Sequence, residues 1–190
     1  MPTRYGLDPA SYRVGLPVKA LRKTSKAKSK LADPLRIFDH AYRILTAEDE
    51  MRQKQNPKDR EGLAKASLIL SAFGLELLLK CLIVLDKKVP PPTHSLSVLF
   101  RQLNHRHKRM IEAKWDVEPS GRAQITPLAT SLKLPTDLPN AIVACQKAFE
   151  RMRYMYEYDD GAVYYLQGLP RLIINLILDE IKPEWKAPCL

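Results

Sequence analysis

One acid and one base stand in the middle of an almost unbroken apolar stretch, residues 67–85. Glu76 and Lys80 are four residues apart, so on a helix they share one face, with the acid on the N-terminal side. A helix that is apolar nearly all round belongs in the centre of a helical bundle or in a membrane. We expect the two charges to pair with each other in or beside a protein core, because a lone glutamate–lysine pair is a poor catalytic signature.

A second group of side chains that could do chemistry gathers late in the chain. Its members are Arg151, Arg153, Tyr154, Tyr156 and Tyr158. Arginines bind phosphate and tyrosine rings stack on bases, so this segment could line an RNA or nucleotide cleft. Alternatively, Glu150 and Glu157 pair with Arg153 along one helix while the tyrosines pack at a dimer seam.

A third group is basic and occupies one face of an expected helix in the middle of the chain. It consists of Arg101, Arg106, Lys108, Arg109 and Lys114, with Glu112 as the only acid in that interval. Such a face is commonly just solvated. It could also extend a nucleic-acid groove that continues onto the N-terminal residues.

The net charge of +10 is concentrated at the N-terminus. Residues 1–30 hold eight lysines and arginines and one acid, which gives +7, and the remaining residues are nearly balanced. A run of cations without acids is typical of segments that touch nucleic acid or that keep a protein soluble. Residues 1–32 also lack a hydrophobic period, so we expect a disordered or extended basic arm, followed by one domain over residues 33–190.

Apolar residues at spacings of three and four recur through this domain, and strand patterns do not. The sequence therefore predicts an all-α, five-helix up-and-down bundle. The expected helices cover about residues 34–55, 60–86, 95–114, 137–158 and 169–182. Residues 117–135 contain three prolines and no period, and we expect a long connection without secondary structure there.

Two details of these helices carry expectations about packing. Gly74 lies inside the second helix, where it would let a neighbouring helix approach closely at a cost of about 1 kcal/mol relative to alanine. In the last helix, Ile174, Leu178 and Ile181 lie off the main apolar stripe. This surplus apolar surface indicates a homodimer face.

Composition also bears on location and cofactors. Residues 68–85 are long enough to span a bilayer, but Glu76 and Lys80 would each cost about 2.5–3.5 kcal/mol near its midplane. The N-terminal residues carry charge without the apolar core of a secretory signal, so we expect a soluble, cytoplasmic protein without membrane contact. The cysteines, Cys81, Cys145 and Cys189, have no motif spacing and form no metal-ligand pattern with the four histidines, so no disulfide, metal or cofactor is expected.

The segment 72–103 resembles the HEPN superfamily of small helical domains. Members of that family carry a buried helix with a Glu-x-x-x-Lys pair, then a short connector, then a helix that opens with His-x-Leu. Here these elements are Glu76 with Lys80, a connector with three consecutive prolines, and His94, Ser95 and Leu96. The resemblance covers about residues 34–182 and implies a dimerising bundle that works with RNA in defence, stress or toxin–antitoxin systems.

The resemblance also implies a ribonuclease site from which this sequence departs. Many HEPN proteins cut RNA without a metal, using an arginine that is followed four to six residues later by a histidine in a late helix. No histidine follows Arg151 or Arg153 at that spacing. Tyr156 and Tyr158 stand there instead as weak catalytic candidates, because a tyrosine with a pKa of about 10 is a poor base near neutral pH.

A formal match to that motif does occur earlier, as Arg101 and His107. It lies in the wrong helix for the family, and a continuous helix would put the two residues on different faces. In a segment with five cations and two histidines, a chance match is the simpler interpretation.

We therefore expect a HEPN-like protein associated with nucleic acid, in first place RNA, in a defence, stress or toxin–antitoxin system, with a degenerate ribonuclease site. The first alternative is an active metal-independent endoribonuclease that uses Arg151 or Arg153 with a tyrosine, or Arg101 with a histidine. The second is a non-catalytic module that docks a partner protein, such as an antitoxin or a nucleotidyltransferase.

Overall fold

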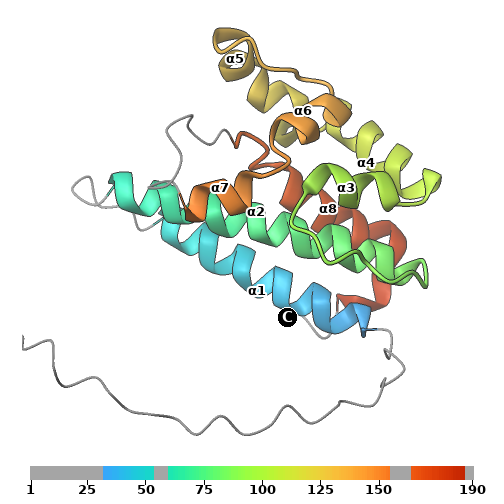
Figure 1. Ribbon diagram of the computed structural model, residues 1–190. Helices are drawn as coiled ribbons and strands as arrows, with labels where there is room; N and C mark the ends of the chain where they lie inside the picture. Colours follow the sequence, from blue (N-terminus) through green and yellow to red (C-terminus); the bar gives the residue numbers. More distant parts are fainter. Residues whose placement is uncertain (1–31, 54–59, 155–163, 187–190) are drawn as a thin grey trace, which may run out of the picture. The chain divides into compact units, whose positions relative to one another are not determined.

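The structure, a computed structural model, describes residues 32–53, 60–154 and 164–186. These residues form helices and connections and contain no strand, so the expectation of an all-α fold is confirmed for this part of the chain. The principal helices are α1 (Pro34–Gln53), α2 (Arg60–Leu85), α3 (Leu96–Gln102), α4 (His105–Val117), α5 (Gln124–Ser131), α6 (Leu138–Ala144), α7 (Ala148–Arg153) and α8 (Leu169–Leu176) (Figure 1). The basic arm expected over residues 1–32 lies almost wholly outside the described residues.

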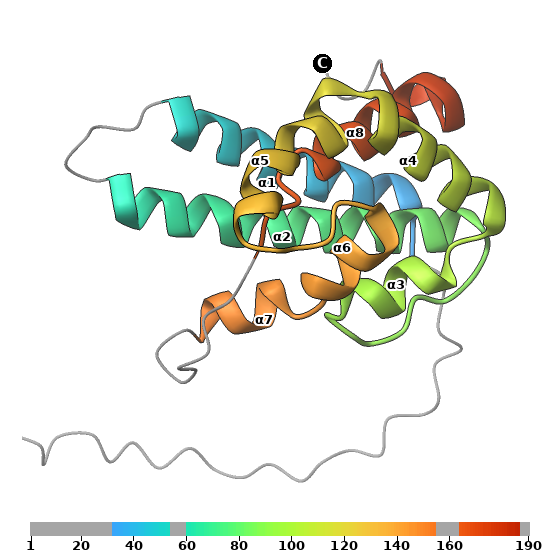
Figure 2. The same cartoon turned by 90° about the horizontal axis from the view of Figure 1, so that it is seen from above.

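Helix α2 is the centre of the arrangement, and its bounds match the expected central helix. Helix α1 runs antiparallel along it, and α3, α7 and α8 also pack on it (Figures 1 and 2). At Gly74 the approach of α1 is so close that an added methyl group would lie 2.6 Å from Cγ of Leu45. The expected role of this glycine, close approach of a neighbouring helix, is confirmed.

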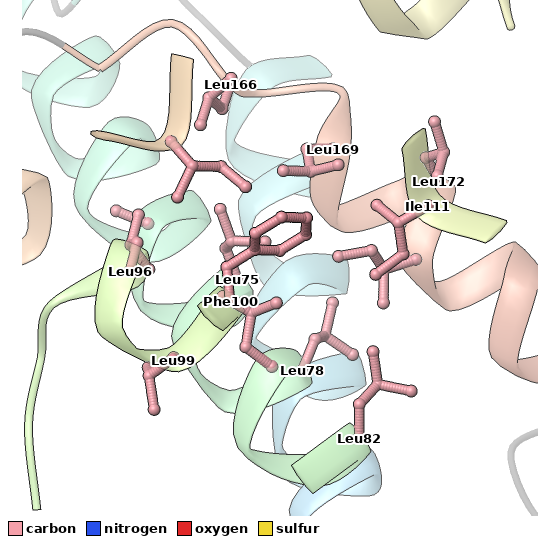
Figure 3. Packing of buried hydrophobic residues seen from close by; sticks show 14 of the residues in the cluster. Leu75, Leu78, Leu82, Leu96, Leu99, Phe100, Ile111, Leu166, Leu169 and Leu172 are labelled. Atoms are coloured by element: carbon pink, nitrogen blue, oxygen red, sulfur yellow. The ribbon is translucent and has the colours of Figure 1, made fainter. Parts of the chain in front are cut away.

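The hydrophobic core forms where α2 meets α3, α4 and α8. Figure 3 shows leucines of α2 directed toward side chains of these three helices. The buried residues labelled there are Leu75, Leu78, Leu82, Leu96, Leu99, Phe100, Ile111, Leu166, Leu169 and Leu172. Both tryptophans, Trp115 and Trp185, are also buried, so their fluorescence reports on unfolding.

Two of the expected helices are each divided, so the count of five is not confirmed. The expected third helix breaks at Leu103, because Asn104 starts a new helix: its Oδ1 accepts a hydrogen bond from the backbone N–H of His107 at 2.6 Å. The expected fourth helix breaks after Ala144 and resumes as α7. Its start is as expected, since Asp137 caps the N–H of Asn140.

The prediction of a structureless connection over residues 117–135 was wrong. The segment Pro119–Ala123 forms a turn that is kinked at Gly121, and α5 follows it directly. The prolines do not prevent this: Pro119 opens the turn, where a missing backbone N–H costs little, and α5 continues through Pro127, which lies inside it.

Helix α2 is long and apolar enough to cross a membrane by length and composition. However, 61% of its most apolar window is buried inside the fold, and buried core helices pass the same test, so this helix is weak evidence for a membrane span. The last helix is also covered within one chain: Ile174 is buried, and Leu178 and Ile181 pack against the core. These three residues therefore do not provide the free apolar face on which the dimer expectation was based.

Candidate nucleic-acid interface

Helix α4 presents its cations to solvent because its other face is fixed in the core. His107, Ile111 and Trp115 are its buried residues, at successive spacings of four. The indole Nε1 of Trp115 donates a hydrogen bond to the carbonyl oxygen of Thr136 at 3.0 Å. The N-terminus of the helix is held by Asn104, whose side chain donates to Asp86 at 2.6 Å.

Three arginines on this side of the molecule are exposed. They are Arg101 at the end of α3 and Arg106 and Arg109 on α4. None of their guanidinium groups forms an ion pair with a carboxylate of the described residues. Lys114, by contrast, is paired: it lies 3.2 Å from Glu180, and that hydrogen bond raises the pKa of the lysine.

We call the side chains of Arg101, Arg106, Lys108 and Arg109 the basic face. Lys108 is tied to the end of α3, because its Nζ donates to the carbonyl oxygen of Arg101 at 2.7 Å. The basic face therefore spans two helices, which this hydrogen bond joins. Lys114, which the sequence grouped with these residues, is engaged by Glu180 and does not belong to it.

A groove of about 450 Å³ lies beside the basic face, between α3, α4 and α6. Arg101, Lys108 and Glu112 line it on the α3–α4 side, and Asn140 and Gln146 line it on the side of α6. Its apolar lining comes from Phe100, Pro139, Ile142 and Val143.

Hydrogen bonds across the groove hold its two sides together. The backbone N–H of Leu96 donates to the carbonyl oxygen of Gln146 at 3.0 Å, and the hydroxyl of Ser97 donates to the side-chain oxygen of Gln146 at 3.0 Å. The groove is thus part of the folded structure and its walls need no partner to assemble.

The late cluster expected from the sequence is only partly described. Arg151 lies on α7 and Tyr154 directly follows that helix, and both side chains are half-buried. The side chain of Arg153, together with Tyr156 and Tyr158, lies outside the described residues. The groove brings together Arg101 and Lys108, and it does not include Arg151 or Tyr154.

The formal motif match of Arg101 and His107 does not form a site. The two residues lie on different helices, and His107 is only 7% exposed. Its Nδ1 lies 3.6 Å from the carboxylate of Asp86. Burial lowers the pKa of His107, Asp86 opposes that shift, and Arg106 and Lys88 add to it.

Glu76 and Lys80 form an ion pair, and this pair has a third member. The Nζ of Lys80 donates to Oε1 of Glu76 at 2.7 Å, and the carboxylate is 1% exposed. The Nδ1 of His94 lies 3.1 and 3.0 Å from the two oxygens of the same carboxylate. The sequence named His94 only as part of a family pattern, and the spacing of 18 residues gave no sign of this contact.

His94 also links this cluster to α7. Its ring lies 5.6 Å from that of Phe149, which stacks on Phe73 of α2 at 4.8 Å. The imidazole itself is 54% exposed. A buried carboxylate thus orients a histidine that solvent can reach, next to the helix that carries Arg151.

A larger groove, of about 720 Å³, runs along α1. It mixes Asp33 and Asp39 with Arg36 and Arg43, and Arg43 is paired with Asp39 at 3.0 Å. This mixture of charges favours no ligand class, so size alone does not identify the site.

Two further findings are negative. No group of three or more histidine, cysteine, aspartate or glutamate side chains among the described residues could hold a metal ion. No family model, curated protein or solved structure matches the chain in the comparisons.

Proposed function

We propose that this chain is an RNA-binding protein and that the basic face is its principal contact with RNA. The observation that carries the proposal is the set of three exposed arginines, unpaired with any described carboxylate, beside a preformed groove. Phosphate contacts supply most of the affinity of such proteins, and arginine is well suited to them because its planar group binds phosphate through two hydrogen bonds. The basic arm would add affinity that does not depend on sequence.

The broader setting of the proposal is a HEPN-like protein of a defence, stress or toxin–antitoxin system, in the cytoplasm. It is supported by the contact between Glu76, Lys80 and His94, because these residues carry the resemblance and meet in space. The type of system rests on the resemblance alone. A homodimer belongs to the same proposal and also rests on the resemblance alone; light scattering at micromolar concentration checks it.

The experiment is a binding titration of labelled single-stranded RNA, read by fluorescence anisotropy at constant salt. The test variant is Arg106→Glu/Arg109→Glu. The matched control is Arg36→Glu/Arg43→Glu, which changes two exposed arginines of α1 and alters the net charge by the same amount. We expect a loss of tenfold or more for the test variant and less than threefold for the control.

Equal losses for the two variants would mean that only net charge matters and would contradict the proposed location. If the native protein binds no RNA, a module that docks a partner protein becomes the better hypothesis.

A metal-independent ribonuclease is the second candidate, and one observation favours it. His94 is held by the buried carboxylate of Glu76 and lies against Phe149, two residues before Arg151 on α7. A carboxylate-oriented imidazole can transfer a proton, and a nearby cation can stabilise phosphate charge. The first proposal includes no proton transfer, because the late helix of this chain lacks the histidine of the family pattern.

Cleavage of single-stranded RNA in the presence of a chelator separates the two candidates. Under the first proposal the native protein binds and leaves the strand intact. Cleavage that His94→Ala abolishes and His105→Ala retains would establish the second candidate instead.

A further inference from the structure

We propose that the groove between α3, α4 and α6 holds an unpaired nucleobase of an RNA strand. This inference rests on the proposed function and adds to it the class of RNA, single-stranded, and the place where a base is held. Three properties of the groove carry it: its size, its apolar lining and the arrangement of polar groups around it.

The size fits one nucleotide. Ligand pockets for small molecules have volumes of about 300–1,000 Å³, and this groove, at about 450 Å³, lies in the lower part of that range. A folded duplex would not fit, and its bases are stacked inside the helix where they cannot enter a pocket.

The lining suits the flat face of a base. Phe100 and Ile142 form a buried floor, and Val143 of α6 lies at the groove with 52% of its surface exposed. Val143 is one of a few large apolar side chains left exposed in the described part of the chain. A base placed on it would remove this apolar surface from water.

The polar groups are divided between the two sides of the groove. Arg101 and Lys108 provide positive charge on the side that continues into the basic face, where the phosphates of a strand would lie. The amide of Asn140 and the carboxylate of Glu112 can bond to the edge of a base, since an exocyclic amine donates to a carboxylate. A free anion such as phosphate would be repelled by Glu112, so the combination favours a base with its phosphate on the rim.

The test blocks the groove chemically in an otherwise unchanged chain. The variant Val143→Cys, in a Cys189→Ser background, is measured before and after reaction with N-ethylmaleimide, which adds a bulky neutral group. The native thiols of Cys81 and Cys145 are buried, and burial also raises the pKa of each to about 12, so we expect neither to react. The matched control is Leu128→Cys on α5, where the replaced side chain is also 52% exposed.

The probes are a single-stranded RNA of ten nucleotides, a duplex of the same length and a free nucleoside monophosphate. We expect labelling at position 143 to weaken single-strand binding at least tenfold and duplex binding less than twofold. Labelling at position 128 should change neither.

Each other outcome has a distinct meaning. If labelling at position 143 leaves single-strand binding unchanged while Arg106→Glu/Arg109→Glu weakens it, the groove inference fails and the proposed function stands. Equal losses for strand and duplex would also overturn it, because the groove would then hold only backbone. A monophosphate that binds as tightly as the strand would overturn it too, by identifying a mononucleotide site, and no binding of any probe would refute the proposed function itself.

Discussion

The carboxylate of Glu76 is buried and has two partners of different exposure. Lys80 lies on the same helix and His94 comes from the connector before α3, so the carboxylate ties that connector to the core helix. Removing one member of a buried ion pair leaves the other charge uncompensated, which commonly costs about 3–5 kcal/mol.

The variant Glu76→Ala should therefore lower the free energy of unfolding by about 3 kcal/mol, the lower end of that range, because Lys80 is partly exposed and can turn to water. Urea denaturation followed by tryptophan fluorescence measures the loss. The matched control is Asp39→Ala, which removes the exposed i,i+4 pair with Arg43 and should cost less than about 1 kcal/mol. A loss of similar size for the two variants would show that the buried cluster is not a structural tie.

We expect the stability of the fold to depend on pH because of the buried His107. Its pKa is lower in the folded protein than in the unfolded chain, chiefly because of burial. The stability that the neutral, buried imidazole contributes is therefore fully present above the unfolded pKa of about 6.5. It is lost as the pH falls through the folded pKa. Below pH 6.5 the unfolded chain binds a proton that the folded chain excludes. The free energy of unfolding can then fall by up to about 1.4 kcal/mol per pH unit.

We expect His107→Gln to reduce the loss of stability between pH 7 and pH 5 relative to the native chain. The control is His105→Gln, which replaces an exposed histidine on the same helix and tests for a general effect of the substitution. Unfolding titrations at a series of pH values provide the comparison. Parallel profiles for the native chain and His107→Gln would refute the assignment.

At the scale of the elements, the packing of α1 on α2 depends on a missing side chain. Gly74→Ala should destabilise the fold by about 1–3 kcal/mol, because its methyl group would overlap the buried side chain of Leu45. Gly62→Ala on the same helix meets no atom within 4 Å and should stabilise it by about 0.5–1 kcal/mol. Thermal unfolding of both variants measures the two effects, and a stabilising Gly74→Ala would contradict the close approach of the helices.

The double variant Leu45→Ala/Gly74→Ala tests the same contact by also removing the side chain that packs on Gly74. Removing the Leu45 side chain creates space, so the cost of the two changes together should be smaller than the sum of the single costs. Additive costs would mean that the two residues do not share this space.

Elements with strong local signals could be predicted from the sequence, and elements that depend on a single capping residue could not. The apolar run of α2 and the capping acids Asp33 and Asp137 gave correct helix starts or bounds. The break before α4 was missed because Asn104 stands inside a continuous helical period and acts only through its side chain. The turn at Pro119 and helix α5, which contains Pro127, were missed because both prolines were interpreted as signs of a connection without secondary structure.

The candidate site could be predicted from the sequence even less completely than the helices. The exposed cations of α4 follow from its helical period, and the Glu76–Lys80 pair follows from its spacing of four. The groove and the contact of His94 with Glu76 join residues that are 18 to 49 positions apart in sequence. No local pattern contains such distances, because they arise only when separate helices pack.

At the scale of the whole molecule, charge is divided between the folded part and the N-terminal residues. Deleting residues 1–30 removes seven of the ten net positive charges. We expect RNA affinity to fall and the salt dependence of binding to become shallower, by about 0.7 in logarithmic slope for each phosphate that the shortened chain no longer neutralises. The melting temperature should change little, and a sharp drop would mean that these residues support the fold.

The location of bound RNA tests the central claim most directly. Single-stranded RNA that contains 4-thiouridine is bound to the full chain and irradiated, and the crosslinked peptides are identified by mass spectrometry. The proposed function and groove predict crosslinks within residues 96–117 and 138–146, which contain α3, α4 and α6. Crosslinks confined to the N-terminal arm or to α1, with none in α3, α4 or α6, would contradict the account.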